Sequence, residues 1–323
     1  MSETASPLRR GRRRPRIGAA LVVLLTLAAY VVVQYVSGGG GPPRCLVRAS
    51  DASGGDSPTY EMTPEQAENA ATISAVGTTR GLPERAVTIA LATALQESAL
   101  RNLNHGDRDS LGLFQQRPST GWGTEAQIQD PVYSAGEFYD HLVKVPGYSR
   151  LPLTEAAQRV QRSGFPQAYA KHEPDATLLA AALTGRSAAT LTCTAPTGTE
   201  PGDPAKVRAA LVRDFGAEVL PGADVGAAGR AGASGPAAEV SVPVPATTGG
   251  SENDGSSSLR GWELAHWAVA QSTALRIDEV RYAGRVWSAQ NTRTANKGWQ
   301  RTRASERTGA DTGLAEVRIR TAQ

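Results

Sequence analysis

The alternation of apolar and polar residues predicts a chain built largely from short helices separated by turns. Residues 62–81 contain the first clear example, because Thr63 suits an N-cap, Pro64 the first helical position, and Gln66 the return bond of a capping box. Gly81 suits the end of this helix. Helical patterns recur further along the chain, around 131–144, 154–163, 174–184 and 203–216.

The second helix, within 82–100, has an unusual composition. Its residues from Ala86 to Gln96 carry no charge, and apolar side chains lie on nearly all of its sides. A helix that is apolar nearly all round is buried. Glu97 follows directly at its end. A surface carboxylate at the solvent-exposed end of the helix is one interpretation, and a carboxylic acid held in a poorly hydrated position is the other.

Composition divides the remainder of the chain. Residues 61–195 predict a mainly helical domain, which contains a turn-rich stretch at 104–125 and is followed by an appended helix within 196–220. Residues 221–258 are rich in Gly, Ala, Ser, Pro and Thr, which predicts a flexible linker. Residues 259–323 predict a small α+β domain, since an amphipathic helix precedes two segments that alternate like strands.

The N-terminus predicts a membrane anchor. Six arginines within a basic cytoplasmic tail, residues 1–16, precede twenty uncharged residues at 17–36. That length spans a bilayer core of about 30 Å, and the arginines place everything after a short spacer, 37–60, outside the cytoplasm. A cleaved signal peptide is the alternative. Under both interpretations the chain after this segment is exported. With a retained anchor, the protein would be a single-pass protein of the cell membrane.

Cys45 and Cys193 are the two cysteines of the chain. In an exported protein this pair predicts a disulfide, with two free thiols as the alternative. No metal site and no cofactor is expected, because the histidines are scattered: His105, His141, His172 and His266.

The net charge of +3 gives no reason to expect nucleic acid as a partner. Residues 259–323, however, hold eleven Lys and Arg against six Asp and Glu. That local excess suits an anionic surface or polymer, or simply a solvated basic face.

The position of Glu97 indicates acid chemistry. Burial raises the pKa of a carboxyl group, and the negative end of a helix dipole also disfavours its ionisation. A carboxylic acid that stays protonated near neutral pH can donate a proton to a leaving oxygen, as cleavage of a glycosidic bond requires.

Two motifs following that helix carry a family resemblance. Glu97-Ser98 precedes Gly112-Leu113-Phe114-Gln115 by fifteen residues, and Pro118 follows closely. This arrangement, over about 60–185, resembles the lysozyme-like superfamily, particularly the soluble lytic transglycosylases and exported actinobacterial proteins similar to them. The resemblance implies a mainly α lysozyme-like domain that cuts the β-1,4 bond between N-acetylmuramic acid and N-acetylglucosamine in peptidoglycan glycan strands.

The resemblance also implies residue roles. Glu97 would be the single general acid and then base, Gln115 would hydrogen-bond the substrate, and Ser98 would orient the end of the helix. The family usually carries a later tyrosine in a Tyr-Asn-Ala-Gly-like segment; here Tyr169 is the nearest counterpart, without Asn-Ala-Gly.

Other polar residues of the turn-rich stretch are candidates for substrate contact. Gln116 and Trp122 suit N-acetyl sugars, although Trp122 equally suits a hydrophobic plug for its loop. Asp107 and Asp109 offer the second carboxylate that a hydrolase would use, or they hold a turn through backbone amides. Hydrolase and lyase chemistry both remain open on the sequence.

The C-terminal segment resembles a small domain that accompanies wall hydrolases and is distantly similar to D-Ala-D-Ala-type zinc peptidases. Its terminal strand, "AEVRIRTA", lacks the zinc-binding histidine of that group. A binding or packing module is therefore expected, with Trp267, Trp287 and Trp299 in its core.

Two functions follow as hypotheses. The first is a membrane-anchored enzyme that cleaves peptidoglycan with Glu97. The second is a non-catalytic cell-wall-binding or scaffolding protein that keeps a lysozyme-like groove.

Overall fold

The computed structural model describes residues 24, 26–28, 42–50, 57–194, 200–221, 238–245, 256–290, 298–303 and 313–323. Residues 43–323 form one compact unit, separate from residues 1–42. The segment proposed as a membrane anchor, 17–36, lies almost entirely outside the described residues. Among those that are described, no helix is both long and apolar enough to cross a membrane.

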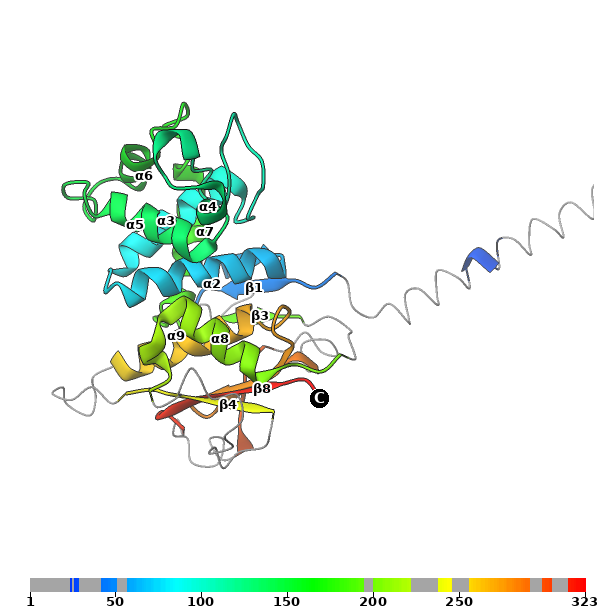
Figure 1. Ribbon diagram of the computed structural model, residues 1–323. Helices are drawn as coiled ribbons and strands as arrows, with labels where there is room; N and C mark the ends of the chain where they lie inside the picture. Colours follow the sequence, from blue (N-terminus) through cyan, green and yellow to red (C-terminus); the bar gives the residue numbers. More distant parts are fainter. Residues whose placement is uncertain are drawn as a thin grey trace, which may run out of the picture. The chain divides into compact units, whose positions relative to one another are not determined.

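Helices and two antiparallel sheets together give the compact unit an α+β architecture, richer in strands than the mainly helical expectation (Figure 1). The helices predicted between residues 62 and 216 are present within a few residues of their expected bounds. Within the described stretch 57–194, the helices are α2 (Pro64–Thr79), α3 (Glu84–Ser98), α4 (Glu125–Ile128), α5 (Pro131–Leu142), α6 (Leu153–Gln161) and α7 (Glu173–Leu183), with short 3-10 turns η1 (Pro118–Thr120) and η2 (Ala170–His172).

Local chemistry explains how α2 begins. The Thr63 hydroxyl accepts a hydrogen bond from the Gln66 amide at 3.3 Å, and the Gln66 side chain accepts one from the Thr63 amide at 2.8 Å. This confirms the predicted capping box, which satisfies two backbone donors that a helix start leaves unpaired. Beyond the helix, Gly81 adopts a left-handed conformation with φ of 68°, where glycine carries no steric cost.

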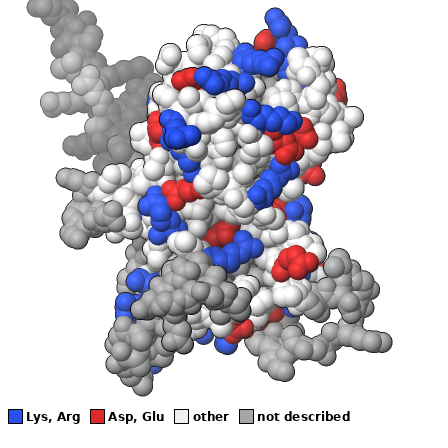
Figure 2. All heavy atoms as spheres, turned by 90° about the vertical axis from the view of Figure 1, so that its left-hand side faces the viewer, with Lys and Arg blue, Asp and Glu red and all other residues white. Residues whose placement is uncertain are grey.

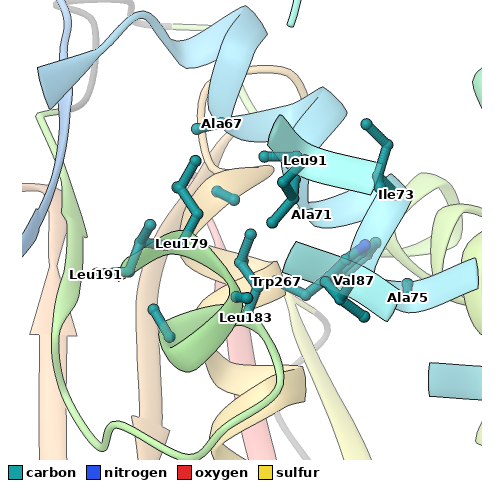
Figure 3. Close-up of a cluster of buried hydrophobic side chains, with 14 of the residues drawn as sticks. Ala67, Ala71, Ile73, Ala75, Val87, Leu91, Leu179, Leu183, Leu191 and Trp267 are labelled. Carbon is teal, nitrogen blue, oxygen red and sulfur yellow. The ribbon is translucent and has the colours of Figure 1, made fainter. Parts of the chain in front are cut away.

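Helix α3 forms the centre of the helical part. Every residue from Ala86 to Leu95 is buried, which confirms the prediction from the uncharged run. The helix contacts α2, α5, α6 and α7. Figure 3 shows its Val87 and Leu91 in a common cluster with residues of α2 and α7.

A three-stranded sheet joins the two ends of the helical part. Its strands β1 (Cys45–Arg48), β2 (Thr59–Met62) and β3 (Leu191–Cys193) lie in the order β2-β1-β3. Cys45 and Cys193 are direct cross-strand partners and form a disulfide, as predicted.

The second sheet has five strands in the order β4-β8-β5-β6-β7. Its first strand corrects the prediction of a linker throughout 221–258, although 222–237 and 246–255 lie outside the described residues. Val240, Val242 and Val244 alternate with exposed residues and are buried, which is the period of a half-buried strand. The strands are β4 (Glu239–Pro243), β5 (Ile277–Tyr282), β6 (Arg285–Ser288), β7 (Gln300–Arg301) and β8 (Glu316–Thr321).

Helices α8 (Pro204–Phe215) and α9 (Ser256–Ala270) connect the second sheet to the helical part. In Figure 1 they lie between α2 and the strands β4 and β8. A 3-10 turn, η3 (Ala217–Val219), follows α8. The helix expected as an appendage is therefore part of the core, because Val207, Leu211 and Phe215 are buried. Trp267 and Trp287 are fully buried and Trp299 partly so, as predicted for a packing module.

Polar side chains of α9 also reach the helical part. Glu263 hydrogen-bonds Thr78 of α2. His266 Nδ1 lies 2.7 Å from the carbonyl oxygen of Ala182 in α7. Burial lowers the pKa of His266 to about 4, so the imidazole is neutral at physiological pH.

Asp214 joins three of these helices through its fully buried carboxylate. The carboxylate accepts hydrogen bonds from Thr72 Oγ1 at 3.0 Å, Trp267 Nε1 at 2.8 Å and Arg213 Nε at 2.7 Å. Thr72 belongs to α2, Trp267 to α9 and Arg213 to α8 itself.

Asp214→Ala is expected to lower the unfolding free energy by about 3 kcal/mol, because the remaining buried donors lose their partner. Urea denaturation measures the change. Asp203→Ala is the matched control, since Asp203 caps the same helix at the surface through the Ala205 amide and its loss costs about 1 kcal/mol. Equal losses in the two variants would contradict the central role of Asp214.

Candidate functional site

Glu97 lies in the last turn of α3, half-buried, where the buried helix ends. Ala99 and Leu100 follow in left-handed conformations with φ of 52° and 59°. Their amides bond back to the carbonyl oxygens of Leu95 and Ala94 at 3.1 Å. This closure ends the helix at Ser98, one residue after Glu97, and so fixes the Glu97 side chain in the last helical turn.

Tyr169 is the first partner of that carboxylate. Its hydroxyl donates a hydrogen bond to Glu97 Oε1 at 2.7 Å, across 72 residues of sequence. Tyr169 lies just before η2 and is fully buried. The structure therefore brings together the two residues that the sequence proposed as catalytic glutamate and site-lining tyrosine.

Burial raises the pKa of Glu97 above its ordinary value. Hydrogen bonds from Tyr169 and then Gln161 act in the opposite direction, because they favour the ionised form, but desolvation is the larger effect. The negative end of the α3 dipole adds to the preference for the neutral acid. Burial also raises the pKa of Tyr169, with the nearby Glu97 charge as a second cause, so its hydroxyl stays protonated and keeps donating.

Gln161 is a site residue that the sequence did not reveal. It is the last residue of α6, and its side-chain amide donates to the carbonyl oxygen of Phe114 at 2.7 Å. Gln161 thus connects the loop at Phe114 to the surroundings of Glu97. No sequence pattern distinguishes this glutamine from an ordinary polar residue on the exposed side of an amphipathic helix.

Ser98 ties the two sequence motifs together. Its hydroxyl donates to the carbonyl oxygen of Leu113 at 2.7 Å and lies 3.1 Å from that of Ala94. Ser98 is buried, so it positions the loop against the end of α3 instead of facing a ligand. The hydrogen bond to Leu113 joins the end of α3 to the loop that begins at Gly112.

The loop after Ser98 is a tight turn closed by paired backbone bonds between Leu111 and Gln116. Gly112 and Gln115 adopt left-handed conformations with φ of 75° and 49°. A side chain at Gly112 would approach the carbonyl oxygen of Ile128 to 2.7 Å, so only glycine fits there. Gln115 is half-buried and its amide lies 3.3 Å from the Gly112 carbonyl oxygen.

Gln116 does not have the substrate contact that the sequence suggested. Its side chain is 2% exposed, and its amide donates to the carbonyl oxygen of Ser134 in α5 at 3.0 Å. Phe114 is likewise buried, with its ring stacked on that of Phe138 at 4.7 Å between centroids. Both side chains hold the loop onto α5 from the core.

Asp109 stabilises the turn in which it lies. This was one of the two roles that the sequence allowed for it, the other being the second carboxylate of a hydrolase. Its carboxylate accepts bonds from the Ser119 amide at 2.8 Å and from Arg117 Nε at 2.7 Å. Hydrogen bonds from Ser119 and then Arg117 hold the pKa of Asp109 well below its ordinary value. Asp107 is exposed in the same loop. The Trp122 indole is stacked on His141 at 4.2 Å between ring centroids. Trp122 therefore packs its loop against the rest of the chain, which was the alternative to a sugar contact.

The described residues contain no group of three or more His, Cys, Asp or Glu that could hold a metal ion. The side chains gathered at the end of α3 are a carboxyl group with a raised pKa, Glu97, a phenol, Tyr169, and a side-chain amide, Gln161. Comparison with protein-family models gives no match for the chain, and comparison with curated protein sequences gives none either.

Proposed function

We propose that this protein is a membrane-anchored enzyme that cleaves peptidoglycan at the bond between N-acetylmuramic acid and N-acetylglucosamine, with Glu97 as its acid and base. The contact between Tyr169 and Glu97 carries the proposal. A carboxyl group at the end of a buried helix has a raised pKa and a phenol hydroxyl 2.7 Å from one of its oxygens. Such a carboxyl group is suited to proton donation.

The proposed reaction proceeds in two steps. Protonated Glu97 first donates its proton to the glycosidic oxygen, and the sugar ring develops positive charge as that bond breaks. The hydrogen bonds from Tyr169 and Gln161 favour the resulting carboxylate. Ionised Glu97 then takes a proton from the attacking hydroxyl, which restores the acid.

The surroundings of Asp109 argue against one of the two candidates, Asp107 and Asp109, for the second carboxylate of a hydrolase. Arg117 and Ser119 engage both oxygens of this carboxylate, so Asp109 is occupied in holding its turn. A lyase needs no second carboxylate, since the 6-hydroxyl of the muramyl residue attacks within the same sugar and leaves an anhydro product.

The Cys45–Cys193 disulfide supports the proposed location outside the cytoplasm, because disulfides persist in oxidising compartments. The proposed anchor is the uncharged stretch 17–36.

Digestion of purified peptidoglycan sacculi tests the proposal. The full-length protein is expected to release soluble muropeptides with anhydro ends, which mass spectrometry identifies. Glu97→Gln is the matched control and is expected to release almost none. Products with reducing ends would replace the lyase by a hydrolase. No release by the wild-type protein, together with its sedimentation with the sacculi, would favour the scaffolding hypothesis instead.

A further inference from the structure

The outer face of the five-stranded sheet carries arginines in two cross-strand rows. Along β8, Val317 and Ile319 are buried, while Arg318 is exposed and Arg320 half-buried. This alternation places Arg318 and Arg320 on the face away from the core. Because each pairs with residues on both neighbouring strands, each defines a row across the sheet.

The row through Arg320 has the charge pattern of an ordinary sheet surface. Arg320 lies between Glu239 of β4 and Glu279 of β5. Its guanidinium is 3.3 Å from Glu279 and 3.1 Å from Asp278. Opposite charges facing one another across strands are stabilising, so the folded chain itself accounts for this row.

The row through Arg318 differs. Arg318 pairs directly with Arg281 of β5, and the flanking positions are Ser241 and Val286, which carry no charge. Like charges directly opposite one another across strands are destabilising. Each arginine also has an acid two residues earlier on its own strand, Glu316 and Glu279, at 2.5 Å and 2.6 Å.

A hollow of about 210 Å³ lies beside this arginine pair. Its charged lining consists of Arg281, Arg285, Arg318 and Glu316, and Gly284 and Gly313 contribute backbone. Arg285 pairs with Tyr282 and Arg301 through its backbone, and its side chain makes no hydrogen bond or ion pair with the residues that the structure describes. On the face shown in Figure 2, by contrast, most basic side chains lie next to acidic ones.

We propose that this hollow binds a phosphate group. Guanidinium groups match the oxygens of a phosphate in a planar, two-bonded geometry. A phosphate between Arg281 and Arg318 would add to the ion pairs with Glu279 and Glu316 that already reduce the repulsion between the two arginines. The group could belong to a free phosphate monoester or to the phosphodiester of a lipid headgroup, which share this chemistry.

Thermal unfolding of the full-length protein tests the site, with inorganic phosphate replacing chloride at constant ionic strength. The melting temperature is expected to rise with phosphate and to saturate. Arg285→Gln and Arg318→Gln are each expected to weaken the apparent affinity at least tenfold. Arg320→Gln is the matched control, because it removes a charge from the same face and the same strand but from the balanced row. It is expected to leave the affinity within about twofold.

Two further probes identify the source of the phosphate. Glycerol 3-phosphate represents a free monoester, and dihexanoyl-phosphatidylglycerol, below its micelle concentration, represents a lipid headgroup. Each is titrated calorimetrically against wild type, Arg285→Gln and Arg320→Gln. If a probe binds the wild type and the Arg320→Gln variant but not Arg285→Gln, the result supports the site and identifies the class of its ligand. An equal loss in Arg285→Gln and Arg320→Gln, or no saturable response to any of the three probes, would overturn it.

Discussion

Glu97→Gln is expected to reduce the rate of glycan cleavage by about two to four orders of magnitude, the range typical of a general acid–base residue. Glutamine keeps the size and the hydrogen-bond acceptor that Tyr169 contacts, but it carries no transferable proton. Muropeptide release from sacculi, followed over time, measures the effect. A variant with more than a tenth of the wild-type rate would exclude Glu97 as the acid.

Folding of this variant is checked separately, through the pH dependence of its stability. The folded state raises the pKa of Glu97. The stabilisation that accompanies the raised pKa is therefore complete at low pH and is lost as the pH rises through the folded-state pKa. The Gln variant should lack this loss. Relative to wild type, its unfolding free energy should increase as the pH rises from about 4 to 8, a range that brackets the ordinary pKa of a glutamate.

Tyr169→Phe separates the acid from its partner. The Tyr169 hydroxyl favours ionised Glu97, so its removal should raise the pKa of Glu97 further. Activity that requires the protonated acid should then persist to higher pH. The rate of muropeptide release, measured against pH, tests this. If the fall in activity at high pH moved to lower pH in the variant, the result would contradict the hydrogen bond that the structure shows.

Cys45→Ser is expected to lower the unfolding free energy by about 5 kcal/mol, because the disulfide closes a loop across a sequence separation of 148 residues and so restricts the unfolded chain. Chemical denaturation under non-reducing conditions measures the loss. Cys193→Ser and the double variant should lose about the same amount, because all three lack the same bond. A double variant as stable as wild type would show that the bond does not stabilise the fold.

The sequence predicted those features that depend on neighbouring residues. The capping box at Thr63 and Gln66 is a local arrangement, and the structure contains it. The buried α3 follows from the uncharged run before Glu97, since such a helix has no polar side to expose. The two motifs, recognised in the sequence only through their resemblance to a family, lie next to each other in the structure, where the Ser98 hydrogen bond to Leu113 connects them.

Features that depend on distant segments were missed. The strand β4 lies within residues of linker-like composition, and its pairing with β8 comes from the far end of the chain. Gln161 contacts Phe114 only because α6 packs against the loop. The pattern of apolar and polar residues within α6 does not indicate this contact. Likewise, α8 reads as a single amphipathic helix, and its buried Asp214 gains its partners only when α2 and α9 are in place.

The Cys45–Cys193 bond gives the chain a mechanical property. Tension applied between the two termini passes from β1 to β3 through this covalent link. The helices between the cysteines, including α3 with Glu97 in its last turn, are bypassed by this covalent path. Force reaches the segment around Glu97 only through the contacts of α8 and α9 with α2 and α7. Once these contacts are broken, we expect the chain between the cysteines to carry no load.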